Sequence, residues 1–265
     1  MPTATVNGLE LAFERVGEGP PLVLAHGVLG DSRTWRPQLA GLAGELTVVA
    51  WDEPGAGRSS EPQEPFELAD YADALAGLIE VLGLGPAAVA GMSWGGIVAQ
   101  ELYRRRPELV AGLILADTYA GWAGSLTTEA CAARLASCLS QSTMPAEEVV
   151  EQWMPSLLST GAPAAVADEL ASILSDFRPA GFRRAASAAA VADTRDLLGR
   201  IEVPTLLLWG EHDARSPVAV GERMRDAIPG AQLSVIADAG HVSNLEQPAR
   251  FNKEVLEFCR GLAGS

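Results

Sequence analysis

A serine between glycines, placed where an apolar run meets a helical pattern, constrains this chain more than any other feature. Gly91–Gly95 have the sequence Gly-Met-Ser-Trp-Gly, preceded by the apolar run Ala87–Ala90 and followed by the helix-forming stretch 96–103. A strand, a tight turn with a central serine and a helix together form a nucleophile elbow. A serine in an ordinary turn is the alternative, but the flanking pattern favours the elbow. Ser93 is therefore the candidate nucleophile of an α/β protein.

The glycines around this serine have a steric role in such an elbow. Gly91, Gly95 and Gly96 remove side chains that would clash in a crowded, strained turn. The serine hydroxyl then projects above the sheet. The helix that follows directs free N–H groups toward the same place, which favours a developing negative charge there.

The composition is that of a globular protein with an acidic surface. The chain has 265 residues, of which 48% are hydrophobic and 20% charged, and this provides enough apolar material for a full core. Its net charge is −15 and its one lysine is Lys253, so we expect no nucleic-acid partner. An acidic balance also disfavours anionic membranes. The sequence leaves the oligomeric state open.

Cysteine usage and the absence of long apolar runs narrow the class further. The chain has three cysteines, Cys131, Cys138 and Cys259. Their odd number disfavours a disulfide framework, and their spacing is not that of metal ligands. Cys131 and Cys138 are seven residues apart, so we expect them to pack on one helix face. The N-terminal residues show no basic start followed by an apolar run, and no stretch of about 18 apolar residues occurs. We expect a cytoplasmic protein without a cofactor or a metal ion.

Short apolar strands alternate with helical patterns along most of the chain. An Asn7-Gly8 turn predicts a hairpin of strands 3–6 and 9–16. Further predicted strands are 22–25, 46–50, 87–90, 113–116, 205–209 and 233–236. Predicted helices are 31–42, 66–82, 96–106, 218–227 and 249–262. Between about 119 and 198 the strand signals vanish and proline-punctuated helical segments follow.

This alternation predicts an α/β fold with a mostly parallel central sheet, helices on both faces and a helical cap inserted after the sixth strand. We divide the chain into a first core part at 1–118, the cap at 119–198 and a second core part at 199–265. The cap should cover the carboxyl ends of the strands, where open α/β sheets bind ligands.

A serine hydroxyl needs a base, and the chain offers three histidines. In proteins with a nucleophile elbow, the acid and then the histidine follow the serine along the chain. His241 follows the last predicted strand and fits that order, and Gly240 gives its loop room to aim the ring. We interpret His26 as an anchor of its own loop and His212 as a loop residue.

Two acids compete to orient His241. We favour Asp213, after strand 205–209, over Asp117, after strand 113–116. The acid should hold the imidazole tautomer and stabilise the imidazolium. Asp117 then caps a loop, and Glu211 lies beside the catalytic set without belonging to it.

Backbone N–H groups should form an oxyanion hole. One donor is expected from Trp94 and the other from Val28, in the glycine-bearing loop after strand 22–25. A second glycine loop, 52–59, lacks the pattern of a phosphate cradle, and we expect Asp52 and Arg58 to pair and brace it.

These motifs resemble those of the α/β-hydrolase superfamily along nearly the whole chain: His26-Gly27, Asp52-x-x-Gly55-x-Gly57-x-Ser59, Gly91–Gly96, Gly210-x-x-Asp213 and Gly240-His241. Within the superfamily, the stretch His241–Glu246 and the cap length resemble capped serine enzymes similar to 3-oxoadipate enol-lactone hydrolases. The resemblance implies the α/β-hydrolase fold and a serine hydrolase of carboxylic esters or lactones, acting on a small molecule through an acyl-enzyme.

The resemblance leaves alternatives open. Relatives with an aspartate nucleophile are disfavoured because the elbow carries Ser93. Hydroxynitrile lyases use an active-site lysine and are disfavoured because the one lysine here, Lys253, lies in the last predicted helix. Carbon–carbon bond hydrolases and perhydrolases share the serine set and remain alternatives, although perhydrolase-like relatives often have proline where this chain has Val28-Leu29. A non-catalytic small-molecule receptor is a further alternative.

Substrate choice should depend on the cap and the oxyanion loop. Candidates for an apolar substrate pocket are Leu29, Trp122, Trp153, Met154 and Phe182, for which plain packing is the competing interpretation. Three cap arginines could bind a substrate carboxylate, although we favour a solvated helix face for them: Arg134, Arg183 and Arg184.

Overall fold

Eight strands form one sheet in the computed structural model, which describes residues 2–263. Their order across the sheet is β1-β2-β4-β3-β5-β6-β7-β8. The strands are β1 (Thr3–Val6), β2 (Leu9–Val16), β3 (Pro21–Ala25), β4 (Thr47–Trp51), β5 (Ala87–Met92), β6 (Val110–Ala116), β7 (Thr205–Gly210) and β8 (Gln232–Ile236). Residues 1 and 264–265, at the ends of the predicted core ranges, lie outside the described residues.

The sheet is antiparallel at one edge and parallel elsewhere. β1 and β2 form the predicted hairpin, and β2 also pairs antiparallel with β4. Asn7 and Gly8 both have positive φ, 50° and 81°, as a two-residue hairpin turn requires. All pairings from β4 to β8 are parallel, which confirms the predicted mostly parallel sheet.

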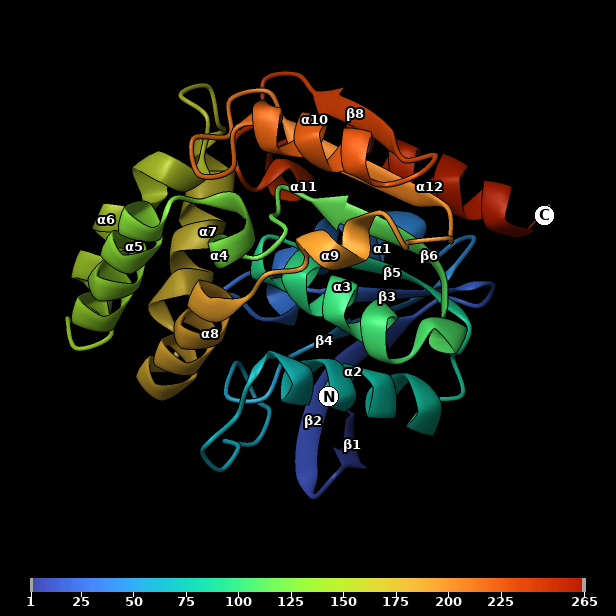
Figure 1. Cartoon of the computed structure of the whole chain (residues 1–265), viewed down its shortest axis with the longest axis horizontal. Coiled ribbons are helices and arrows are strands. Elements are labelled where there is room, and N and C mark those ends of the chain that lie inside the picture. The colour runs from blue at the N-terminus through green and yellow to red at the C-terminus, as the bar shows by residue number, and fades with distance from the viewer. Residues whose placement is uncertain (1, 264–265) are drawn as a thin grey trace.

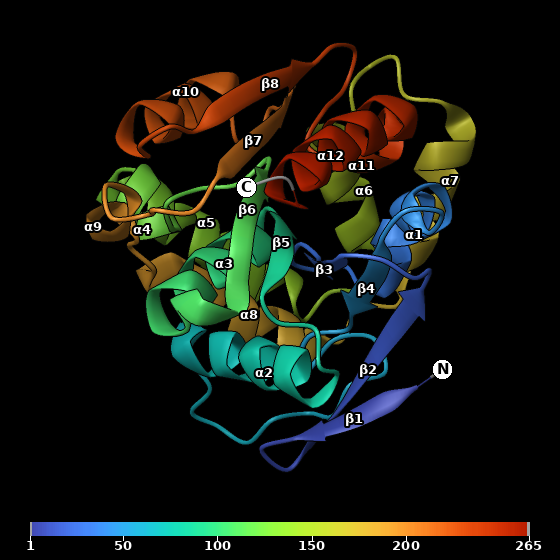
Figure 2. The same ribbon diagram turned by 90° about the vertical axis from the view of Figure 1, so that its right-hand side faces the viewer.

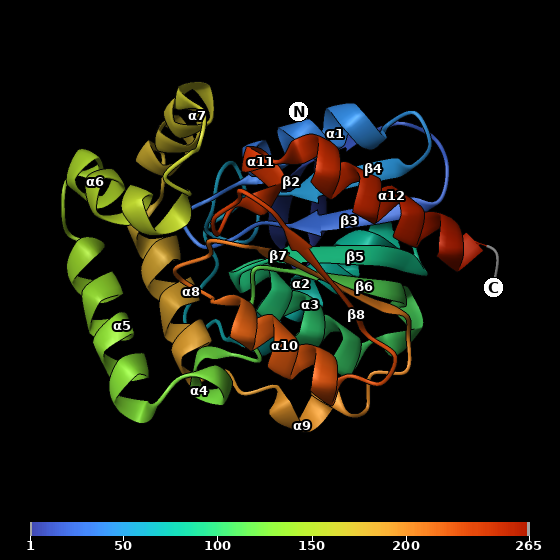
Figure 3. The same ribbon diagram turned by 90° about the horizontal axis from the view of Figure 1, so that it is seen from above.

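Helices cover both faces of the sheet (Figures 2 and 3). On one face lie α1 (Arg36–Leu42) and α12 (Pro248–Ala263), and on the other α2 (Leu68–Val81), α3 (Trp94–Arg105) and α10 (Val218–Ala227). Every residue of β4 and β5 is buried, because side chains on both faces of these strands pack under helices. Other short helices are η1 (Ser32–Trp35), η2 (Pro107–Leu109), α9 (Arg195–Leu198) and α11 (Ser243–Glu246).

The helix predicted at 31–42 is two elements in the structure. A 3₁₀ turn, η1, is capped by Asp31, whose side chain accepts the N–H of Arg33. The backbone leaves helical geometry at Trp35, and α1 begins directly after it, with Pro37 in its first turn. Proline has no N–H to continue a preceding helix but is tolerated in the first turn of a new one. The prediction of one continuous helix was therefore wrong.

Other helix ends follow local chemistry. Glu67 and Asp70 form a capping box at the start of α2, and Gly83 follows that helix with φ of 64°. At the end of α3, Arg104 and Arg105 form ion pairs with acids of neighbouring elements. The predicted termini of α2 and α3 are thus within two residues of those observed.

A helical cap lies between β6 and β7, at one end of the sheet (Figure 1). It contains α4 (Trp122–Ser125), α5 (Thr128–Gln141), α6 (Ala146–Leu157), α7 (Ala164–Ser175) and α8 (Pro179–Val191). The cap inserted after the sixth strand is therefore confirmed, while the boundaries at 119 and 198 stay a prediction. Cys131 and Cys138 are both buried on α5, as expected for packing residues. Among the described helices, none combines the length and apolar character needed to cross a membrane.

Candidate active site

Ser93 occupies a strained turn between β5 and α3. Its φ of 53° and ψ of −116° are conformations that a residue with a Cβ rarely adopts. Two hydrogen bonds hold the turn: the Ser93 N–H donates to the Ala116 carbonyl at 2.9 Å, and the Thr118 hydroxyl donates to the Ser93 carbonyl. The strand, strained serine and helix have the geometry of an elbow.

The glycines of the elbow are required by close backbone approach. A Cβ at Gly91 would lie 2.2 Å from the Gly95 carbonyl oxygen, and a Cβ at Gly95 would lie 2.2 Å from the Ala25 carbonyl oxygen. At Gly96, a Cβ would lie 2.4 Å from the Thr118 hydroxyl oxygen. At Gly91 and Gly95 the obstructing atoms belong to the backbone, which cannot move aside as a flexible side chain can, so larger residues there would displace the turn.

A continuous hydrogen-bonded chain joins Ser93, His241 and Asp213. His241 Nε2 lies 2.9 Å from Ser93 Oγ, and His241 Nδ1 lies 2.8 Å from Asp213 Oδ2. The other oxygen of Asp213 accepts the N–H groups of Arg215 and Ser216, each at 2.8 Å. Asp213 follows β7 and His241 follows β8, and these parallel neighbours bring the two loops together. His241 and Asp213 are both buried, which strengthens their interaction.

Asp117, the alternative acid, makes different contacts. It is buried and accepts the Gly210 N–H at 2.7 Å and the Ser243 hydroxyl at 2.6 Å. Burial and the neighbouring Asp213 carboxylate raise the pKa of Asp117 well above its usual range. Asp117 thereby ties the end of β6 to β7 and to the segment after His241, in keeping with a loop-capping acid.

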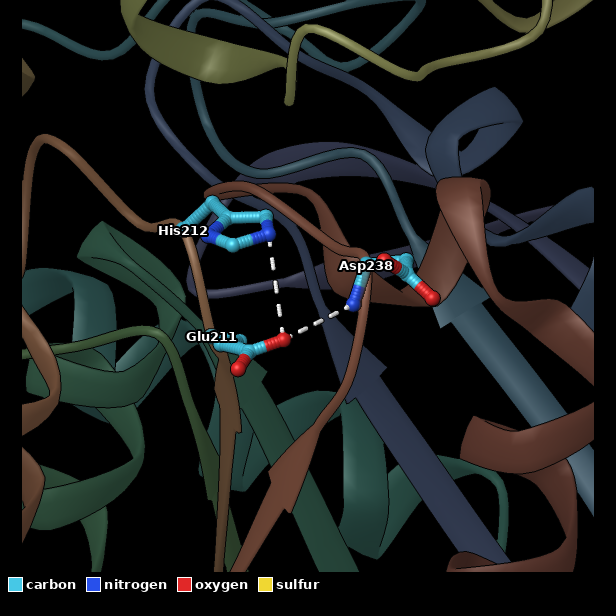
Figure 4. Close-up of side chains that lie close together, drawn as sticks. All are labelled: Glu211, His212 and Asp238. Carbon is cyan, nitrogen blue, oxygen red and sulfur yellow. Dashed lines mark hydrogen bonds and ion pairs between the residues drawn. The ribbon is translucent and has the colours of Figure 1, made fainter.

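Glu211, His212 and Asp238 form an exposed group on the loops after β7 and β8 (Figure 4). The Glu211 carboxylate accepts the Asp238 N–H at 3.3 Å and lies 3.7 Å from His212 Nε2. The ligand atoms of the three residues lie within 4.8 Å of one another, but all three are solvated and one carboxylate already bridges the loops. These contacts fit the interpretation of Glu211 and His212 as loop residues beside the group of Ser93, Asp213 and His241.

The backbone N–H groups of Val28 and Trp94 lie near Ser93, and neither has an acceptor among residues 2–263. Val28 follows β3, and Trp94 begins the helix that follows β5; the two strands are neighbours, paired up to Ala25 opposite Gly91. His26 holds the first loop: its Nδ1–H donates to the Gly27 carbonyl at 2.9 Å, and its Nε2 accepts the Glu53 N–H at 3.1 Å. His26 therefore has the anchoring contacts expected of it.

Glu53 is a site residue that the sequence interpretation missed. Its buried carboxylate accepts the indole N–H of Trp94 at 2.6 Å, directly behind the elbow. Burial raises the pKa of Glu53 to about 7, against the opposing effects of His26, Trp94 and Arg184. An acid two residues beyond Trp51, the end of a wholly buried strand, was the signal available in the sequence.

Asp52, beside Glu53, braces the second glycine loop. It accepts the Ser32 N–H at 2.8 Å, the Arg58 N–H at 2.9 Å and the Arg58 Nε–H at 3.1 Å. Although burial opposes ionisation, these donors hold the pKa of Asp52 below its usual range. The predicted pairing with Arg58 is confirmed.

Ser93 lines a small cavity of about 20 Å³, which holds roughly one water molecule. Its wall combines the loops after β3, β5 and β8 with cap side chains: Gly27, Val28, Gly30, Thr34, Met92, Trp153, Leu157, Leu170, Leu174, His241 and Val242. Of the predicted pocket residues, Trp153 lines this cavity. Leu29 and Phe182 line an adjoining crevice that shares Val28 and Gly30 with it.

The other predicted pocket residues lie elsewhere. Trp122 packs beneath the Arg134 guanidinium, and Met154 packs against the apolar core. Arg183 is exposed, as a solvated helix face predicts, but Arg184 is buried and its Nη1 lies 2.7 Å from Glu61. The solvated interpretation of Arg184 was wrong because α8 turns this residue toward the core, where an acid compensates it.

Comparison with known proteins places this architecture in a family. A strand–serine–helix elbow followed along the chain by an acid and a histidine is the arrangement of α/β-hydrolase folds. Residues 22–254 match the Alpha/beta hydrolase family, and the chain belongs to that family.

Individual relatives include esterases and lactonases. The 3-oxoadipate enol-lactonase 2 of Acinetobacter baylyi is 28% identical over 256 residues, covering 96% of this chain and 94% of that protein. A thermophilic esterase from Thermogutta terrifontis matches with a TM-score of 0.91 and 33% identity over 98% of each chain. The enol-lactonase from Burkholderia xenovorans LB400 matches with a TM-score of 0.88 and 27% identity, over 97% of this chain and 99% of that one. The resemblance to enol-lactonase-like α/β-hydrolases is confirmed.

Proposed function

We propose that this chain is a serine hydrolase that cleaves a small carboxylic ester or lactone through an acyl-enzyme on Ser93. The observation that carries the proposal is the unbroken chain from Ser93 Oγ to His241 at 2.9 Å and from His241 to Asp213 at 2.8 Å. Similarity to an esterase and to two enol-lactonases supports this class of substrate.

In the first half-reaction, Ser93 Oγ attacks the substrate carbonyl carbon while its proton passes to His241 Nε2. Asp213 keeps the His241 Nδ1–H directed toward its carboxylate and stabilises the imidazolium. The hydrogen bonds that Asp213 accepts from the N–H groups of Arg215 and Ser216 fix the position of the carboxylate. Collapse of the tetrahedral intermediate breaks the ester C–O bond, and the leaving oxygen takes the proton from His241.

The negative charge on the tetrahedral oxygen is held by the N–H groups of Val28 and Trp94. Support comes from their position after the adjacent strands β3 and β5 and from their lack of other acceptors among the described residues. Losing one such donor lowers turnover by roughly 10²–10³-fold in related chemistry.

In the second half-reaction, water attacks the Ser93 ester while His241 takes a proton from it. The proton then returns to Ser93 Oγ as the acid is released. With a lactone, the leaving alcohol stays tethered to the acyl group and the product is a single hydroxy acid or its keto form. Every step uses groups of the chain and one water molecule.

The volume beside Ser93 limits the substrate. A cavity of about 20 Å³ admits no ester in this conformation, so cap side chains such as Trp153 and Leu174 must move when substrate binds. The predominantly apolar wall favours an uncharged acyl portion next to the reacting carbon.

Titration of acid released from a panel of lactones and short-chain esters tests the proposal. Ser93→Ala should lower turnover by roughly 10⁴–10⁶-fold because the nucleophile is lost. Ser187→Ala, at an exposed cap position, is the matched control and should retain full activity.

Equal turnover by wild type and Ser93→Ala would contradict the mechanism. No turnover by folded wild type across the panel would count against an ester or lactone substrate. Assays with ketones that have no ester bond would then test the carbon–carbon hydrolase alternative, and a binding assay with intact Ser93→Ala affinity would test the receptor alternative.

A further inference from the structure

A second cavity, also lined by Trp153, lies between the cap and the loop after β7. It has a volume of about 330 Å³ and is bounded by α5, α6 and the two residues that follow Asp213. Arg134, Cys138 and Gln141 contribute from α5, Trp153 and Ser156 from α6, and Arg215 from the loop after β7. It shares one residue, Trp153, with the cavity at Ser93.

Two guanidinium groups converge on this cavity. Arg215 lies over the Trp153 ring, with its Cζ 3.9 Å from the ring centroid, and its Nη1 donates to Ser156 Oγ at 2.9 Å. Arg134 donates to the Tyr119 hydroxyl at 2.8 Å and to the backbone carbonyl of Arg215 at 3.4 Å. Neutral partners therefore fix both side chains without neutralising either charge.

The absence of acid partners is unusual for this chain. Among residues 2–263, Arg134 and Arg215 are the half-buried or buried arginines with no carboxylate oxygen within 4.0 Å. The comparably buried arginines are all paired with acids: Arg33, Arg104, Arg106, Arg178 and Arg184. The chain carries 34 acidic residues against 19 basic ones, so partners are not scarce.

This arrangement has an electrostatic cost. Burial and the neighbouring Arg134 charge lower the pKa of the Arg215 guanidinium from its usual range. By contrast, the hydrogen bonds that Arg33 donates to the Asp31 carboxylate raise the pKa of Arg33. When two like charges lie close together and are partly desolvated, an anion that binds between them stabilises both.

We propose that the cavity between α5, α6 and residues 214–215 binds a compact carboxylate or phosphate anion between Arg134 and Arg215. Guanidinium groups donate paired, charge-assisted hydrogen bonds to the oxygens of both anion types. A volume of about 330 Å³ suits a small molecule rather than a peptide. The site is separate from the reaction at Ser93, but its occupant and a substrate would share the Trp153 indole as a wall.

Isothermal titration with inorganic phosphate and with succinate, at constant ionic strength set by chloride, tests the proposal. Wild type should bind at least one of the two anions saturably, and the two titrations distinguish a phosphate site from a carboxylate site. Arg134→Gln and Arg215→Gln should each weaken binding by about tenfold or more, because each removes a charge-assisted interaction. Arg183→Gln is the control, since Arg183 is an exposed cap arginine that also has no acid partner.

Several results would overturn the proposal. They are no saturable binding of either anion by wild type, unchanged binding in Arg134→Gln, or an equal loss in Arg183→Gln. Because Arg215 packs on Trp153, its variant can lose stability, and the melting temperature is measured for each protein first. If Arg215→Gln does not fold, the Arg134→Gln result decides.

Discussion

The loops at the strand ends and the cap form opposite walls of one cavity, but they are built in different ways. On the loop side, backbone geometry fixes Ser93: its strained φ and the glycines around it leave no freedom to move. On the cap side, Trp153, Leu170 and Leu174 fill the space with side chains and leave about 20 Å³.

This contrast separates chemistry from substrate choice. Under the proposed mechanism, Ser93, His241 and Asp213 are held in place before any substrate binds, as electrostatic catalysis requires. The proposal requires cap side chains to move to make space for the substrate, and hydrogen bonds join the cap to the loops after β7 and β8. One such contact is made by Glu246, which accepts the Gly240 N–H at 2.7 Å and the Ser159 hydroxyl of the cap at 2.6 Å.

The largest expected effect comes from a substitution in the loops at the strand ends. Asp213→Asn should lower kcat by about 10⁴-fold, because an amide cannot hold the histidine tautomer or stabilise the imidazolium. The measurement is steady-state hydrolysis of the best substrate from the panel.

Asp117→Asn is the matched control, with the same acid-to-amide change at a buried position near His241. The raised pKa of Asp117 favours its neutral form, so a neutral amide should fit the same position and most activity should remain. A larger loss in Asp117→Asn than in Asp213→Asn would assign the orienting role to Asp117.

A steric change at the elbow should have the next largest effect. Gly95→Ala places a Cβ 2.2 Å from the Ala25 carbonyl oxygen, and neither backbone can give way. We expect a loss of at least about 3 kcal/mol in the free energy of unfolding, measured in urea. Gly44→Ala is the control, because a Cβ there has no neighbour within 4 Å. Equal stabilities for the two variants would mean that the elbow is not rigid.

Glu53 lies where the two sides meet, next to Trp94 of the elbow and the cap residue Arg184. Its pKa of about 7, against an ordinary value of 4.5, means that an unfolded chain ionises this group earlier as pH rises. The folded state therefore loses stability between about pH 4.5 and pH 7, by about 3 kcal/mol, and no more above that range.

Glu53→Gln should abolish that part of the pH dependence while the amide oxygen still accepts the Trp94 N–H. Urea unfolding of wild type and variant at pH 5 and pH 8 gives the difference. Glu18→Gln, an exposed change of the same type, should keep the wild-type slope. A Glu53→Gln variant with that same slope would show that Glu53 ionises at its ordinary pH.

The two sides also differ in how far the sequence predicts them. Strand and elbow positions follow from apolar runs and glycines, since local backbone requirements are written in adjacent residues. Cap residues that line the cavity, such as Leu157 and Leu170, do not differ in sequence pattern from packing residues. The contacts of Glu53 with Trp94 and of Arg184 with Glu61 join segments far apart in the chain, so no local pattern could reveal them.

The smallest expected effect concerns the cap side alone. Leu174→Ala enlarges the cavity at Ser93, and we expect about a tenfold change in the kcat/KM ratio of a bulky to a small acyl ester. Leu78→Ala removes the same atoms from the buried face of α2, away from the site. Both variants should lose about 2–5 kcal/mol of stability, so stability alone cannot explain a difference in preference. If Leu78→Ala shifts the ratio as much as Leu174→Ala does, the cap wall does not set substrate choice.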